Sequence, residues 1–128
     1  MEVRNFLEAE LTSGVSHHGE GEVRSVRLYG GTDFATPLRF LYYTVIPPGT
    51  SIGYHRHKDD EEMYIILEGR GLMSVDGETR EVKAGDAVLN RPFGSHGLKN
   101  HTEEDLRLLV FEVTQCPSAN AGTGGPQA

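Results

Sequence analysis

Residues 49–69 read GTSIGYHRHKDDEEMYIILEG, and this stretch carries the strongest structural signal in the chain. His55 and His57 are separated by one residue, so on an extended strand their side chains project from the same face. A charged turn follows at residues 58–61, and Glu62 then begins a second, mostly apolar segment. If the two segments are neighbouring strands, the carboxylate returns beside the two imidazoles.

A second stretch, residues 85–100, reads GDAVLNRPFGSHGLKN and supplies a third imidazole, His96. It lies about 40 residues further along, in what reads as a proline- and glycine-rich turn over residues 91–97, so only the folded chain can bring it to the others. Three imidazoles and one carboxylate are a borderline ligand set that suits one divalent transition metal ion, namely Zn²⁺, Fe²⁺, Mn²⁺, Ni²⁺, Co²⁺ or Cu²⁺.

Short extended segments separated by turn signals run along the rest of the chain. The Asp76-Gly77 pair favours a tight hairpin, and residues 13–22 read as a polar loop. Residues 1–10 fit a short helical turn or an edge strand equally well. No helix of more than two turns is predicted, which indicates an all-β sandwich or barrel. The predicted strands are 23–29, 38–46, 51–57, 62–67, 71–75, 79–82, 87–89 and 106–113.

The two stretches resemble the two motifs of the cupin superfamily. Residues 49–69 satisfy every fixed position of the first motif, which is glycine, five residues, His-x-His, three or four residues, glutamate, six residues and glycine. In the second, Pro92 and Gly94 each stand one place later than usual, while the spacing from Gly85 to His96 is the usual one. The resemblance covers about residues 38–113 and identifies the chain as a small single-domain cupin.

This resemblance implies a jelly-roll barrel of two antiparallel sheets with a metal ion inside one end. By motif position it implies the ligands His55, His57, Glu62 and His96. Glu61 is a rival for the carboxylate position, but only Glu62 has the six-residue spacing to Gly69. The resemblance also implies a homodimer and a small-molecule substrate or ligand.

Several other polar residues have two readings. Tyr64 shares strand parity with Glu62, so it is expected to face inward, and it is the fallback general base if the site is catalytic. Tyr42 and Thr44 are expected to be core or lumen residues. Arg56 is expected to point outward, and Asn100 to fix a turn. His17, His18 and His101 are expected to be solvated loop histidines, although His101 is close enough in sequence to assist His96. Asp59, Asp60 and Glu61 are expected to form a solvated acidic turn.

Length and charge limit the classes of function. A chain of 128 residues has room for one domain, predicted over residues 1–115, with a flexible polar tail at 116–128. A net charge of −7 argues against nucleic acid or an anionic membrane as the main partner. One cysteine, Cys116, excludes an internal disulfide, and no segment reads as a signal peptide or membrane span, so the cytoplasm is the expected compartment.

The ligand set does not choose among reactions. Similar single-domain cupins include dioxygenases, decarboxylases, isomerases, lyases and cyclases, so a metal-dependent enzyme acting on a small organic molecule is the first hypothesis. The alternative is a non-catalytic cupin that binds or senses a small ligand.

Overall fold

Strands make up most of the described chain. The computed structural model describes residues 1–114, so the predicted tail at 116–128, with Cys116 and the domain end at 115, lies outside the described residues. The elements are β1 (Thr12–Gly14), β2 (Val23–Gly30), the short 3-10 helix η1 (Gly31–Asp33), β3 (Leu38–Ile46), β4 (Ser51–Arg56), β5 (Asp60–Glu68), β6 (Arg70–Val75), β7 (Glu78–Lys83), β8 (Ala87–Asn90), β9 (Ser95–Lys99) and β10 (Leu106–Thr114).

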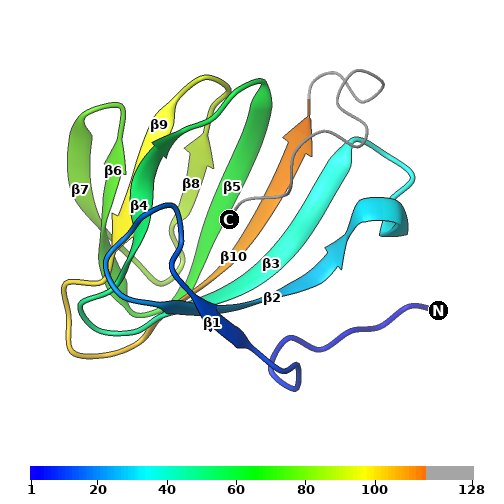
Figure 1. Cartoon of the computed structure of the whole chain (residues 1–128), viewed down its shortest axis with the longest axis horizontal. Coiled ribbons are helices and arrows are strands. Elements are labelled where there is room, and N and C mark those ends of the chain that lie inside the picture. The colour runs from blue at the N-terminus through cyan, green and yellow to red at the C-terminus, as the bar shows by residue number, and fades with distance from the viewer. Residues whose placement is uncertain (115–128) are drawn as a thin grey trace.

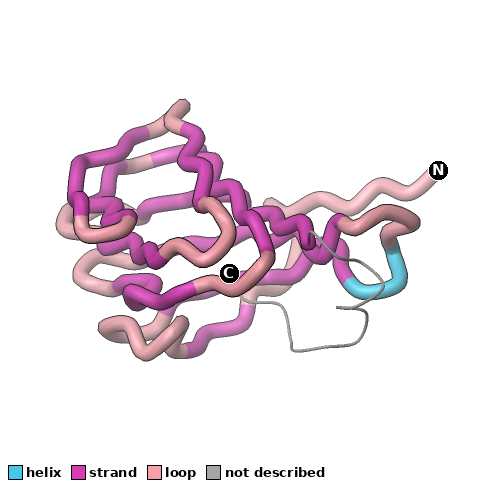
Figure 2. The backbone as a smooth tube through the Cα atoms, turned by 90° about the horizontal axis from the view of Figure 1, so that it is seen from above, coloured by secondary structure: helices cyan, strands magenta, loops and turns pink. Residues whose placement is uncertain are grey.

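Two antiparallel sheets face each other and enclose the interior (Figures 1 and 2). The larger sheet has the order β1-β2-β3-β10-β5-β8, and the smaller has the order β4-β9-β6-β7. The chain passes from one sheet to the other between β3 and β4 and again between β4 and β5. This arrangement confirms the all-β barrel of two antiparallel sheets.

The inward faces of β5 and β10 change from apolar to polar along their length. On β10 the buried positions run from Leu106, Leu108 and Val110 to Glu112 and Thr114. On β5 they run in the opposite chain direction, from Ile66 and Tyr64 to Glu62 and Asp60, as antiparallel pairing requires. One end of the interior is therefore a hydrophobic core, and the other end collects buried carboxylates.

The loop between β1 and β2 is held tightly against β4. The amide of Gly53 donates to the carbonyl of Ser16 at 3.0 Å, and Ser16 also pairs with Ile52 in an isolated bridge. A Cβ atom on Gly53 would lie only 2.0 Å from the carbonyl oxygen of His17, so glycine is required for this approach. His17 itself has a φ of 50°, a conformation that few non-glycine residues adopt.

Two predicted loops contain strands. His96 lies within β9, not in a turn, because residues 95–99 pair with both β4 and β6. Residues 12–14 form the short edge strand β1, which pairs with β2. Residues 1–10 adopt turns and irregular structure, and Phe6 packs on Tyr43 with ring centroids 4.5 Å apart.

Asn100 fixes the turn before β10, as predicted. Its amide nitrogen donates to the carbonyls of Ile46 and Glu104 at 2.8 and 2.7 Å, and its side-chain oxygen accepts from the amide of Thr102. These bonds tie the β9–β10 connection to the end of β3.

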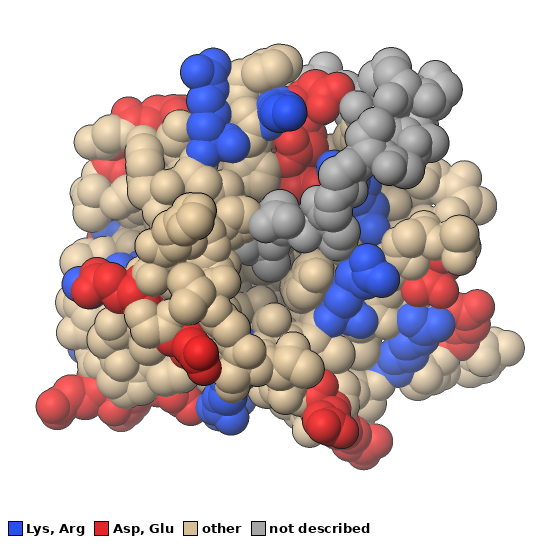
Figure 3. All heavy atoms as spheres, in the orientation of Figure 1, with Lys and Arg blue, Asp and Glu red and all other residues tan. Residues whose placement is uncertain are grey.

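Acidic and basic side chains are interspersed on the face seen in Figure 3. Among residues 1–114, no helix is long and apolar enough to cross a membrane.

Candidate metal centre

The structure brings His55, His57, Glu62 and His96 together at the polar end of the interior. One potential ligand atom from each of the four lies within 4.8 Å of the others. The Nε2 atoms of His55 and His57 are 2.9 Å apart, and Oε1 of Glu62 lies 3.0 Å from Nε2 of His96 and 3.3 Å from Nε2 of His57. Glu62 and His96 are each 1% exposed, and His57 is buried.

Both sheets contribute to this group. His55 on β4 and His96 on β9 are direct partners in the smaller sheet. Glu62 enters from β5 in the larger sheet, where it pairs with Glu112 of β10. His57 lies just beyond the end of β4, on the connection that crosses to β5. The rival Glu61 lies at the opposite parity on β5, partly exposed and 4.0 Å from Arg91.

The hydrogen bonds of His55 and His57 orient the two rings so that their Nε2 atoms face each other. Nδ1 of His55 lies 2.7 Å from the carbonyl oxygen of Gly53, which can only accept, so that nitrogen carries the proton. Nδ1 of His57 lies 2.5 Å from Oδ2 of Asp60 and is fixed as a donor in the same way. In the neutral rings, both Nε2 lone pairs then point into one space, together with Glu62.

Such a donor set fits a cation. Two facing lone pairs repel unless a proton or a metal ion lies between them, and Oε2 of Glu62 is buried with no hydrogen-bond partner among residues 1–114. The hydrogen bonds that the two outer Nδ1 atoms donate to Gly53 and Asp60 also match the way metal-binding histidines are oriented in proteins. The residues present therefore fit a divalent transition metal ion.

Asp60 and Glu112 lie next to Nδ1 of His57, on the far side of its ring from Nε2, and neither was expected at the site from the sequence. Asp60 was expected to be solvated, but it is buried against His57 because it shares strand parity with Glu62 on β5. Although burial opposes its ionisation, hydrogen bonds with His57 and Glu112 hold the pKa of Asp60 well below its ordinary value. The sequence did offer a signal for Asp60, which follows His57 by three residues: it has the same strand parity as Glu62, so both side chains share one face of the strand.

Glu112 is the neutral partner of this carboxylate pair. Burial, reinforced by the hydrogen bond to Asp60, raises the pKa of Glu112 to about 9, so it carries a proton at neutral pH and donates it to Asp60. Nη1 of Arg39 lies 3.2 Å from Oε2 of Glu112. Only one negative charge therefore stands directly behind His57.

The two adjacent histidines are held in opposite charge states without a metal ion. Burial lowers the pKa of His55 to about 4, so its ring is neutral at physiological pH. Burial also opposes charge on His57, but hydrogen bonds with Asp60 and Glu62 outweigh it and raise that pKa to about 10. A metal ion has to displace the proton on Nε2 of His57.

We expect metal binding to strengthen as the pH rises. Since the pKa of metal-free His57 lies near 10, about one proton leaves per ion bound at neutral pH, and affinity rises about tenfold per unit between about pH 6 and 8. Calorimetric titration with Zn²⁺ in two buffers of different ionisation enthalpy measures this proton. Binding without proton release would show that His57 is not displaced.

The remaining predicted residues are placed as follows. Tyr64 faces inward and stands edge-on to His96, with ring centroids 5.3 Å apart. Its hydroxyl has no partner among the described residues, and burial raises its pKa well above the ordinary value, which suits donation of a hydrogen bond better than proton abstraction. Its catalytic role stays a prediction. Arg56 is exposed, as expected.

The loop histidines behave differently from one another. His101 does not assist His96; its Nε2 lies 3.0 Å from Glu81 at the surface. His18 is exposed, whereas His17 stacks face to face on His55, with ring centroids 3.5 Å apart and planes 5° from parallel. This stacking depends on the close approach of the His17 backbone to Gly53, so it could not be predicted from residue spacing.

A two-sheeted antiparallel barrel with three histidines and a glutamate at one end is the architecture of a class of small barrel proteins that bind a metal ion. Comparison with known proteins gives the family. The protein-family model described as "Cupin domain" matches residues 42–112, so the chain belongs to the cupin family.

Three relatives illustrate its neighbours. The chain is 33% identical over 95 residues to an oxalate-binding protein of Thermotoga maritima, covering 74% of this chain and 78% of that one. It is 35% identical over 85 residues to dimethylsulfoniopropionate lyase DddW of Ruegeria pomeroyi, covering 66% of this chain and 55% of that one. A crystal structure of a predicted oxalate decarboxylase from Thermotoga maritima aligns with a TM-score of 0.85 at 28% identity, over 88% of this chain and 99% of that one.

Proposed function

We propose that this cupin binds one divalent transition metal ion through His55, His57, Glu62 and His96 and is an enzyme acting on a small organic carboxylate. The observation that carries the proposal is the convergence of three Nε2 atoms and one carboxylate oxygen, with two of the rings oriented by their own outer hydrogen bonds. The relative that binds oxalate supports a carboxylate as the ligand.

The chain's residues define what the site does with such a ligand. When bound, the ion supplies Lewis-acid polarisation of a carboxylate or carbonyl oxygen. Glu62 and the negative charge of Asp60 balance the ion's charge, so a carboxylate ligand would be held by direct coordination to the ion and not by a net positive charge of the site. Tyr64 would donate a hydrogen bond beside His96, because burial keeps its hydroxyl protonated by raising its pKa well above the ordinary value.

The second candidate function is non-catalytic binding of a small carboxylate. The observation that favours it is the absence, among the described residues of the interior, of a free buried carboxylate suited to act as base, since Glu112 is protonated and Asp60 is engaged by His57. The relative at 33% identity is also named for binding.

One experiment separates these two functions. Protein reconstituted with metal is incubated with oxalate, dimethylsulfoniopropionate and salicylate in turn, and the acids are followed by ¹³C NMR, with chelator-treated protein as the control. Metal-dependent loss of any of them supports the enzyme. Saturable, metal-dependent binding with no turnover supports the binding protein, and no binding contradicts both.

A further inference from the structure

Unpaired polar atoms cluster around Glu62 in the metal-free chain. In the described part of the chain, six buried side-chain nitrogen or oxygen atoms have no hydrogen-bond partner. Five of them belong to Glu62, to its strand partners Asn90 and Glu112, and to Tyr64, which lies two residues along β5. The sixth is Oγ1 of Thr44. Because an unpaired buried polar atom is costly, this cluster points to bonds that form only in another state of the site.

Asn90 contributes two of these atoms and lies directly opposite Glu62. It is the last residue of β8 and is 2% exposed, and both its amide nitrogen and its amide oxygen lack a partner among the described residues. Its register partner on β5 is Glu62, and both side chains face the interior. Residues directly opposite each other in antiparallel strands have Cβ atoms about 4.5–5.5 Å apart. The amide and the carboxylate are therefore neighbours.

Metal binding changes the hydrogen bonds of Glu62. Without a metal ion, Oε1 of Glu62 accepts from Nε2 of His96 at 3.0 Å and lies 3.3 Å from the protonated Nε2 of His57. A histidine nitrogen that binds a metal ion has to give up its proton. Both donors are therefore lost when these nitrogen atoms bind the ion, and the carboxylate then depends on other donors to keep its orientation.

We propose that Asn90 is a positioning residue of the metal centre, and that its side-chain amide donates a hydrogen bond to Oε2 of Glu62 once the ion is bound. The inference rests on the proposed function and adds to it a residue that does not contact the ion. Carboxylates that bind metal ions in proteins are themselves held by outer hydrogen bonds. A neutral amide supplies such a bond without adding a charge beside Glu62 and Asp60.

The second asparagine of the interior shows what a structural role looks like. Asn100 is also buried, and its amide donates to the carbonyls of Ile46 and Glu104. Asn90 has no such bonds among the described residues, so the metal-free fold loses stability by keeping it. A role in the metal-bound state gives a reason for an amide at this position.

The test replaces Asn90 with leucine, which has a similar size and no hydrogen-bonding group. The Zn²⁺ affinity of metal-free wild type and variant is measured by competition with a chelator. Asn90→Leu should weaken Zn²⁺ binding about 10- to 100-fold, as loss of an outer partner of a metal ligand does. Metal-free Asn90→Leu should melt at the same or a higher temperature than wild type, because the amide that it removes is unpaired there.

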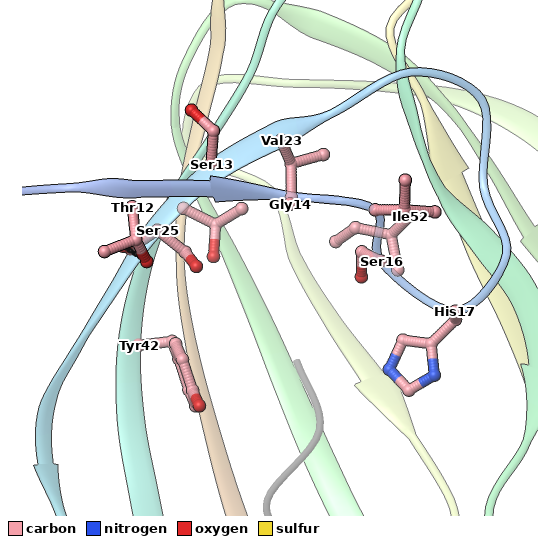
Figure 4. Close-up of a pocket in the computed structure, with 11 residues that line it drawn as sticks. Thr12, Ser13, Gly14, Ser16, His17, Val23, Ser25, Tyr42 and Ile52 are labelled. Carbon is pink, nitrogen blue, oxygen red and sulfur yellow. Dashed lines mark hydrogen bonds between the residues drawn. The ribbon is translucent and has the colours of Figure 1, made fainter.

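Thr44→Val is the matched control. It keeps the side-chain shape and removes the other buried, unpaired side-chain group of the described residues, from the same sheet. Thr44 lies opposite Leu108, four residues along β10 from Glu112, and it is one of the residues that line the cavity shown in Figure 4. Since distant sites act independently, Thr44→Val should leave the Zn²⁺ affinity unchanged within about twofold.

The visible absorption spectrum of Co²⁺-loaded protein gives a further measurement, because it reports the arrangement of the ligands around the ion. If Asn90 orients Glu62, the spectrum of Asn90→Leu will differ from that of wild type. The spectrum of Thr44→Val will match wild type. A purely structural asparagine would alter melting without altering this spectrum.

A Zn²⁺ affinity and a Co²⁺ spectrum of Asn90→Leu equal to those of wild type overturn the inference and leave the metal centre standing. A lower melting temperature of metal-free Asn90→Leu assigns the amide a structural role and also overturns it. Equal losses of affinity in Asn90→Leu and Thr44→Val show a general effect of changing the interior and overturn it as well. Wild-type protein that takes up no Zn²⁺ overturns both the inference and the proposed function.

Discussion

Alanine in place of His57 will lower the affinity for a divalent transition metal ion by more than about 100-fold. Loss of an outer hydrogen-bonding partner of a metal ligand already costs about 10- to 100-fold, and this change removes the ligand together with the hydrogen bond that it donates to Asp60. Calorimetric titration of metal-free protein with Zn²⁺ measures the loss.

The same variant will be less stable without metal, by roughly 3 kcal/mol at neutral pH, because it leaves Asp60 buried without its charged partner. The pKa of His57 is raised, so this contribution is fully present below its unfolded value near 6.5 and disappears as the pH rises through about 10. His101→Ala is the control, since that ring lies away from the candidate ligands and contacts Glu81 at the surface. Full metal occupancy in His57→Ala would remove His57 from the ligand set.

Glutamine in place of Glu62 will also lower metal affinity by more than about 100-fold. The substitution keeps the size of the side chain but removes the one carboxylate of residues 1–114 whose oxygen lies within 3.3 Å of both His57 and His96. It also leaves an ion with no negative charge in direct contact, which is costly in a buried site. The metal content of the purified variant, measured by elemental analysis, reports the effect.

Glu61→Gln is the matched control for this substitution. Glu61 is the neighbouring residue with the same side chain, but it lies at the outward parity of β5. Its replacement should leave metal content unchanged. Equal losses in the two variants would indicate a general charge effect and not a ligand role for Glu62.

The fold class and the inward direction of several side chains could be predicted from local rules, whereas the set of four converging residues was predicted from the resemblance to the cupin motifs. Alternation on β5 places Glu62 and Tyr64 inward, and Asp76-Gly77 forms the hairpin between β6 and β7. The cupin resemblance, which depends on spacing alone, is confirmed by the family match over residues 42–112. Spacing is informative here because each motif spans one strand–turn–strand unit, β4 to β5 in the first and β8 to β9 in the second.

The supporting residues could not be predicted with the same rules. Asp60 belongs to a run of acidic residues that favours a solvated turn, and only the burial of one strand face distinguishes it from its neighbours. Glu112 lies at the end of an apolar strand, 50 residues away from Glu62 in sequence. Its role follows from the pairing of β10 with β5, which is a long-range contact.

The β1–β2 loop shows the same limit. A polar, glycine-rich loop is normally solvated, and residues 13–22 give no periodic signal. The packing of His17 on His55 depends on the missing side chain at Gly53, which the sequence shows only as one glycine among 16.

Elemental analysis of untagged protein, purified without chelator, tests the central claim most directly. The account predicts about one equivalent of a divalent transition metal ion per chain, removable by chelator and restored on reconstitution. Iron would direct further work to oxygen-dependent reactions, and zinc, nickel or manganese to non-redox reactions. Protein that contains no such ion, and takes none up on reconstitution at neutral pH, would contradict the assignment of His55, His57, Glu62 and His96 as a metal centre.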